Sequence, residues 1–98
     1  MTDEGRAKAR LDRLRRRLDA LDDELLALVA RRAAVVDEVA VLKQGHGQPL
    51  HDAEREGQIL ARLVAQRPAR LGVREVEVLV QAVLRACSAE STSAGPTR

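Results

Sequence analysis

The chain has 98 residues, which is enough for a single domain with a modest hydrophobic core. It contains no Phe, Tyr or Trp, so Leu, Val and Ala must build the core, which suits packed helices better than a β-sandwich. The net charge of +2 comes from 17 basic and 15 acidic residues that are interspersed, and the missing aromatic rings argue against base stacking on single-stranded nucleic acid.

A long apolar seam dominates the first half of the chain and predicts one very long N-terminal helix. Its residues recur mostly at alternating steps of three and four, as in helices that pack along their length. They are Leu11, Leu14, Leu18, Leu21, Leu25, Leu28, Val35, Val39 and Leu42. We expect a cap at Thr2 or Asp3, fraying of residues 1 to about 5, and an end near Gln44, before a segment with two glycines and a proline.

One position of this seam is charged. The residue that follows Leu28 on the seam is Arg32, where an apolar side chain is expected. A charge on a buried face is costly unless an anion meets it. Arg32 is therefore a candidate ligand-binding residue.

The length of this helix also predicts the assembly. About 40 helical residues at ~1.5 Å each extend ~60 Å, whereas a compact domain of this size has a radius of gyration of ~13 Å. The first helix must therefore extend beyond any monomeric globule, while its seam stays apolar to the far end. We expect a second copy of the chain to cover the seam in a symmetric homodimer.

A second helix is predicted from an Asp52 N-cap to Gln66, ahead of the stop at Arg67-Pro68. Glu56 and Asp52 continue its apolar face toward the N-terminal end, which suggests that both carboxyl groups belong to a site. The alternative is that Asp52 only caps the helix and that Glu56 only favours the helix dipole.

The third element, from Val73 to about Ala89, has an ambiguous period, because its alternate valines also fit a strand. We predict a helix from its length and from the lack of a partner strand elsewhere. The expected fold class is all-α, with a helical domain at residues 1–90 and a disordered polar tail at 91–98.

The single cysteine, Cys87, permits no intrachain disulfide, and the charged N-terminus has no apolar leader. No run approaches the ~18 apolar residues of a membrane span, so we expect a soluble, cytoplasmic protein with no membrane partner. We interpret the arginines at 13 and 15–17 as a solvated helix face and expect no nucleic-acid partner.

Metal and covalent chemistry find little support in the sequence. It has no GxxxxGK[ST] loop and no CxxC pair, and His46 and His51 are too isolated for a ligand set. Cys87 lacks a pattern of His and Asn partners. We therefore expect no metal, no cofactor and no thiol nucleophile.

Cations remain as the candidate chemistry. Arg32 and Lys43 are eleven residues apart, almost three turns, and share a helix face. Arg15 lies seventeen residues before Arg32, ~25 Å along the helix, so only the Arg15 of an antiparallel partner chain can reach a ligand held by Arg32. This set predicts a small polyanion that is bound between helices.

The ordered set of these residues resembles the all-helical chorismate mutase family. The matching positions are Leu14-Arg15, Leu18-Asp19, Leu21-Asp22, Leu25-Leu26, Arg31-Arg32, Lys43, Gly47, Pro49-Leu50, Asp52 and Arg55-Glu56. The resemblance extends over residues 11 to 66 and, more loosely, over 71 to 91. It implies an intertwined homodimer of three-helix chains. It also implies an isomerase that converts chorismate to prephenate, on the branch toward phenylalanine and tyrosine.

The resemblance also assigns roles to individual residues. It implies that Arg32 and the partner chain's Arg15 hold the two substrate carboxylates, and that Lys43 contacts a carboxylate and the ether oxygen of the breaking bond. It also implies that Asp52 and Glu56 lie near the ring hydroxyl and that Arg55 supports the site. The rearrangement is unimolecular. The enzyme must therefore hold the substrate in its folded, diaxial shape and stabilise the charge that develops on the ether oxygen.

One departure from the family lies in the last helix. Members usually carry a hydroxyl residue there and, one turn later, a Gln or Glu that meets the ether oxygen. Aligning the apolar positions puts Cys87 and Ser91 at these places, whereas a shift by one residue puts Ser88 and Thr92 there. Neither register supplies Gln, although Glu90 is close by, so the second contact to the ether oxygen stays unassigned.

Two other interpretations stay open. A sister activity on this scaffold, 4-amino-4-deoxychorismate mutase or isochorismate pyruvate lyase, acts on a similar dianion. A non-catalytic helical dimer, by contrast, would pair Arg32 with an internal carboxylate. Asp52 followed by Arg55-Glu56 fits the ordinary mutase pattern best.

Overall fold

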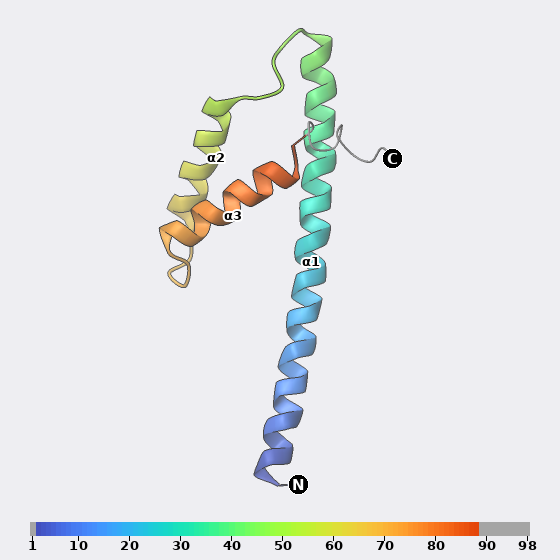
Figure 1. Cartoon of the computed structure of the whole chain (residues 1–98), viewed down its shortest axis with the longest axis vertical. Helices are drawn as coiled ribbons and strands as arrows, with labels where there is room; N and C mark the ends of the chain where they lie inside the picture. Colours follow the sequence, from blue (N-terminus) through green and yellow to red (C-terminus); the bar gives the residue numbers. More distant parts are fainter. Residues whose placement is uncertain (1, 89–98) are drawn as a thin grey trace.

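Three α-helices make up the part of the chain that the computed structural model describes, residues 2–88 (Figure 1). They are α1 (Asp3–Gly45), α2 (Ala53–Gln66) and α3 (Val73–Ala86). No β-strand occurs within this range, which confirms the all-α prediction and the helical interpretation of the valine-rich third element. The predicted tail at 91–98 lies outside the described residues.

Helix α1 is 43 residues long, and its sequence stabilises both of its ends. The Thr2 side chain accepts a hydrogen bond from the Gly5 N–H (2.9 Å), and the acidic first turn complements the helix dipole. The expected fraying was therefore wrong for the described residues, because this cap holds the helix from Asp3 onward. At the other end Gly47 adopts a φ of 67°, which glycine allows without steric cost, and the chain turns away from the helix.

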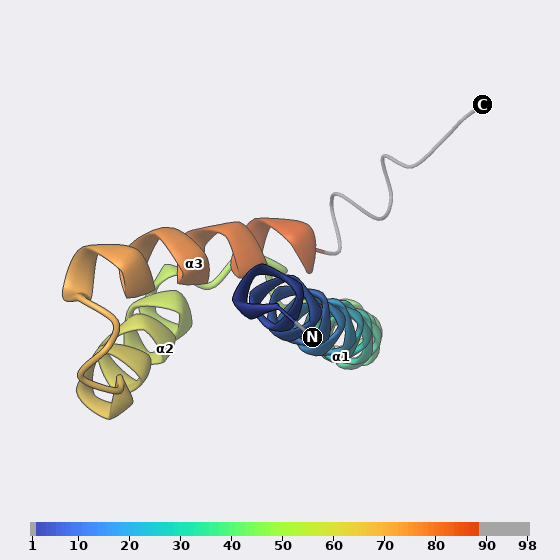
Figure 2. The ribbon, with the colours of Figure 1, turned by 90° about the horizontal axis from the view of Figure 1, so that it is seen from below.

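Helices α2 and α3 pack on each other and contain most of the buried core. Ile59 of α2 and Val76 and Val80 of α3 are each 8% exposed or less. The partly buried side chains around them are Leu60, Leu63, Val64, Leu71 and Leu84. As predicted, α2 follows an Asp52 cap and ends at Gln66. Figures 1 and 2 show α3 crossing from α2 to the upper half of α1, so α3 holds α2 beside α1.

Helix α3 ends where it meets α1. The sequence predicted a helix to about Ala89, but α3 ends earlier, at Ala86, and Cys87 caps it. The Cys87 side chain is 1% exposed, and its thiol donates a hydrogen bond to the Val29 carbonyl oxygen of α1 (3.6 Å). This contact ties the end of α3 to α1.

Helix α1 extends far beyond the two shorter helices (Figure 1). The molecule measures 67 × 37 × 18 Å with a radius of gyration of 18.9 Å, against ~13 Å for a compact domain of this size. No residue of α1 is buried, and the seam residues Leu18, Leu21 and Leu25 are more than half exposed. The predicted extension of the first helix is therefore confirmed. In the described residues no helix is long and apolar enough to cross a membrane.

Two valines on opposite faces of α3 test this core, because Val80 is 4% exposed and Val78 is 53% exposed. Val80→Ala should lower the free energy of unfolding by about 2 kcal/mol, through lost apolar burial and a residual cavity. Val78→Ala, the matched control, should change it by less than about 0.5 kcal/mol. Urea denaturation at one protein concentration measures both, and equal losses would contradict this core.

Candidate active site

A cleft of about 350 Å³ opens where the C-terminal part of α1, the α1–α2 loop, the start of α2 and the end of α3 come together. Its apolar walls are Val35, Val36, Val39, Ala40, Leu50, Ile59 and Leu84. Its polar and ionisable side chains are Arg32, Lys43, His51, Asp52, Arg55, Glu56, Cys87 and Ser88. Most of the predicted site residues thus line one cavity, as expected of a small-ligand site.

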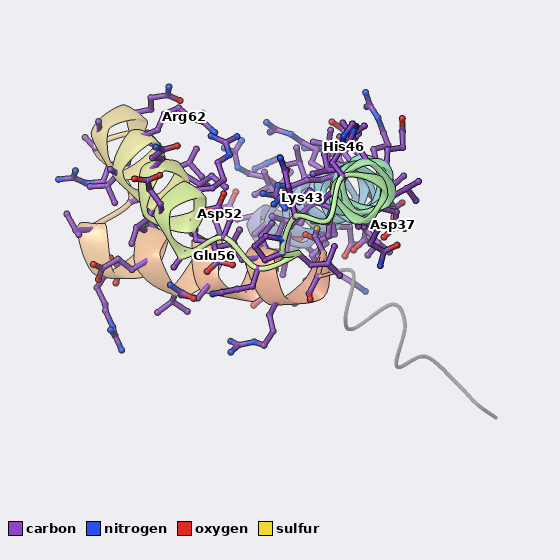
Figure 3. The ribbon with its side chains drawn as sticks, turned by 90° about the horizontal axis from the view of Figure 1, so that it is seen from above. Asp37, Lys43, His46, Asp52, Glu56 and Arg62 are labelled. Carbon is purple, nitrogen blue, oxygen red and sulfur yellow. The ribbon has the colours of Figure 1, made fainter. Side chains whose placement is uncertain are left out.

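Two cations of α1 line this cleft. Lys43, in the last turn of α1, donates a hydrogen bond from its ammonium group to the Leu50 carbonyl oxygen of the loop (3.4 Å). Arg32 is partly buried and forms no ion pair within the described part of the chain. Figure 3 shows Lys43 on the side of α1 that faces Asp52 and Glu56. An arginine without an ion-pair partner and a lysine that line the same cleft suit an anion.

The start of α2 brings two carboxyl groups to the same cleft. Asp52 accepts a hydrogen bond from the Arg55 N–H (3.0 Å) and so caps α2. The same residue lines the cleft, as do Arg55 and Glu56. Glu56 lies in the first turn, where the helix dipole favours its charge. The two interpretations are therefore compatible, because Asp52 and Glu56 stabilise the start of α2 and also line the cleft.

His51 is a cleft residue that the sequence analysis did not predict. Its Nδ1 lies 3.6 Å from Oε2 of Glu56, and the two side chains are 67% and 43% exposed. His51 directly precedes the Asp52 N-cap, and Glu56 is the fourth residue of the helix. Side chains at these two positions contact each other in the hydrophobic staple of helix N-termini. The positions of His51 and Glu56 on either side of the Asp52 N-cap are therefore the sequence signal from which His51 could have been predicted as a cleft residue.

The end of α3 contributes Cys87 and Ser88 to the cleft, so both registers considered for the last helix bring their first residue to the cavity. Their second residues, Ser91 and Thr92, lie outside the described residues, as does Glu90. The roles predicted for Cys87 and Ser91 therefore stay predictions. Within residues 2–88 no group of three or more His, Cys, Asp or Glu side chains is placed to hold a metal ion.

Arg15 is the predicted site residue that a single described chain does not bring to the cleft. It is exposed on the N-terminal half of α1, ~25 Å along the helix from Arg32.

A second cavity, of about 440 Å³, lies between α2 and α3 and is lined mainly by apolar side chains. Arg32 lines both cavities, so an apolar helix seated in the second would lie directly beside the first.

Comparison with known proteins identifies the family. The model of the family described as chorismate mutase type II matches residues 14–91. The chain belongs to this family. It is 33% identical over 83 residues to the T-protein of Haemophilus influenzae, a match that covers 84% of this chain and 22% of that protein. It is 39% identical over 83 residues to the T-protein of Enterobacter agglomerans, with 85% and 21% covered.

A shorter relative and a solved structure agree with this assignment. The chorismate mutase of Methanocaldococcus jannaschii is 35% identical over 54 residues, which are 55% of this chain and 54% of that protein. The chain thus spans about a fifth of the two T-proteins and about half of this relative. The structure of chorismate mutase (Form I) from Thermus thermophilus matches with a TM-score of 0.77 at 29% identity, covering 80% of this chain and 98% of that chain. The predicted resemblance to all-helical chorismate mutases is confirmed.

Proposed function

We propose that the protein is a chorismate mutase that rearranges chorismate to prephenate. The observation that carries the proposal is Arg32, which has no ion-pair partner among the described residues, in one apolar-walled cleft with Lys43 and Glu56. Chorismate carries two carboxylates, so fixed cations in a cleft are the groups that it requires. Membership of the chorismate mutase type II family and the names of the relatives support the same activity.

The chemistry of the rearrangement suits these residues. A carbon–carbon bond forms while the carbon–oxygen bond of the ether breaks, and negative charge develops on the ether oxygen. The enzyme must hold the substrate in its folded, diaxial shape and stabilise that charge. Arg32 binds a carboxylate, and Lys43 contacts a carboxylate and the ether oxygen. Inside a cleft with little water, fixed charges act more strongly than they do in solution.

The remaining residues hold the other end of the substrate. Glu56 and Asp52 lie near the ring hydroxyl, and Arg55 supports this part of the site. Cys87 lines the cleft while its thiol donates to the Val29 carbonyl. Cys87 and Ser91, which belong to the same register of the last helix, are the further proposed contacts to the substrate.

The enzyme is a homodimer in which the partner chain completes each site. The uncovered seam of α1 and the apolar cavity beside Arg32 are complementary surfaces. An antiparallel α1 from a second copy would bury both of them. It would also bring Arg15 of the partner subunit to the carboxylate that Arg32 leaves unbound. A cytoplasmic location stays a prediction from the sequence.

A substrate assay on the purified protein tests the proposed activity. Chorismate should be consumed and prephenate should accumulate without any added cofactor. Parallel assays with 4-amino-4-deoxychorismate and isochorismate test the sister activities, and a clear preference for either would replace the proposed substrate. If the folded protein turns over none of the three, the non-catalytic dimer becomes the better interpretation.

The proposed homodimer can be tested by its mass in solution. Light scattering coupled to size exclusion chromatography at micromolar concentration should give twice the chain mass of 10.7 kDa. Leu21→Glu should give a monomer, because it puts a charge on the seam at a side chain that is 58% exposed in the single chain. Val41→Glu is the control: Val41 is 70% exposed but lies off the seam, so the dimer should persist. A folded, helical wild-type species at the monomer mass would contradict the proposal.

Arg32→Ala should lower kcat/KM by a factor of ~10²–10³ or more, because it removes an electrostatic anchor of the substrate. Its stability should be unchanged or higher, since the substitution removes a charge from an apolar seam. Arg31→Ala, the exposed neighbour that lines neither cavity, is the matched control and should keep wild-type activity. Near-normal turnover in Arg32→Ala would reject Arg32 as a site residue, and its unfolding would favour a structural role.

Subunit mixing tests the shared site. Arg15→Ala and Arg32→Ala should each be inactive as homodimers. In a mixed dimer the site on the Arg15→Ala chain keeps its own Arg32 and receives Arg15 from its partner, whereas the other site lacks both arginines. Random pairing makes about half of the dimers mixed, so about a quarter of the wild-type activity should return after refolding the variants together. If mixed dimers form and stay inactive, the two arginines do not share a site.

A further inference from the structure

We propose that His51 is a positioning residue that holds the Glu56 carboxylate in place for the substrate hydroxyl and makes substrate binding depend on pH. The part of this inference that concerns substrate rests on the proposed mutase activity. The part that concerns the pair itself rests on the geometry of the free protein.

The geometry ties the two side chains together. His51 Nδ1 and Glu56 Oε2 are 3.6 Å apart, and both residues line the main cleft. The backbone fixes this proximity, because Asp52 caps α2 between them and leaves His51 just outside the helix, across from the fourth helical residue. His51 and Glu56 therefore contact each other for the same reason that two apolar residues do when they occupy these positions in a hydrophobic staple.

The surroundings explain why Glu56 needs such a partner. The other ionisable groups that line the cleft are Arg32 and Lys43 from α1, Asp52 and Arg55 at the start of α2, and Cys87 at the end of α3. A Glu56 carboxylate without His51 has the cations of the same cleft as alternative partners. If it paired with one of them, it would neutralise a charge that the substrate carboxylates require. His51 thus keeps the acidic and the basic parts of the site apart.

The pair is an ion pair only while the imidazole is protonated. Histidine is the residue type whose charge changes most readily near neutral pH, so the pair is a candidate for pH-dependent behaviour. The pair is partly exposed, and exposed ion pairs contribute little free energy, which limits the expected effect on binding to about two- to fivefold.

Steady-state kinetics at about pH 6 and about pH 8 test the proposal. Relative to wild type, His51→Ala should raise KM about two- to fivefold at the lower pH, with a smaller difference at the higher pH and little change in kcat. His51→Arg carries a permanent charge, so it should keep KM low at both pH values. His46→Ala is the matched control, because His46 lies on the same loop but does not line the cleft (Figure 3). A purely structural role for His51 predicts no rescue by arginine and no pH dependence of the defect.

NMR of the imidazole rings separates this proposal from the proposed activity. The chain has two histidines, so His46→Ala assigns both sets of ring signals. Glu56→Gln should shift the His51 signals and leave those of His46 in place, whether or not the protein turns over chorismate. Shifted signals without any turnover would leave the pair standing and reject the mutase. Unshifted His51 signals, or a KM that is indifferent to His51→Ala at both pH values, would overturn the positioning role.

Discussion

Coverage of the α1 seam is the constraint on which the rest of the structure depends. Helix α1 has 43 residues and no buried one, whereas α2 and α3 have 14 residues each. Two helices of ~21 Å cannot cover one of ~65 Å. Apolar area that stays in water contributes none of the ~25 cal/mol per Å² that burial gives. The core of Ile59, Val76 and Val80 is small for the same reason, because the apolar seam residues of α1 stay largely exposed in the single chain.

The cleft lies where helices end, and this explains its polar character. Helix ends leave N–H and C=O groups that need partners, so capping side chains gather there. Asp52 caps α2 and lines the cleft, Lys43 occupies the last turn of α1 and reaches the loop, and Cys87 caps α3. Asp52, Lys43 and Cys87 thus lie at helix ends and line the cleft, whereas Arg32 comes from within α1.

The sequence predicts those parts of the site that follow the helical period. Arg32 is visible because it interrupts a seam, and Lys43 because eleven residues return it to the same face. Features that depend on tertiary contacts are not visible in this way. The junction of α3 with α1 includes a hydrogen bond between Cys87 and Val29, which are 58 positions apart, and the place of His51 depends on the path of the α1–α2 loop. The proposed role of Arg15 depends on another chain.

The two helices that form the facing walls of the cleft, α1 and α2, are joined mainly through α3. Helix contacts link α2 to α3 and α3 to α1, so α2 is held beside α1 mainly through α3 and its junction at Cys87. The walls of the cleft that face each other, with Arg32 and Lys43 on α1 and Glu56 on α2, belong to the pair that is joined indirectly. An anion that lies between these two cations would be attracted by both of them. Under the proposed function, a bound dianion that also contacts Glu56 would connect α1 to α2 directly, so its binding would support the packing of the two walls.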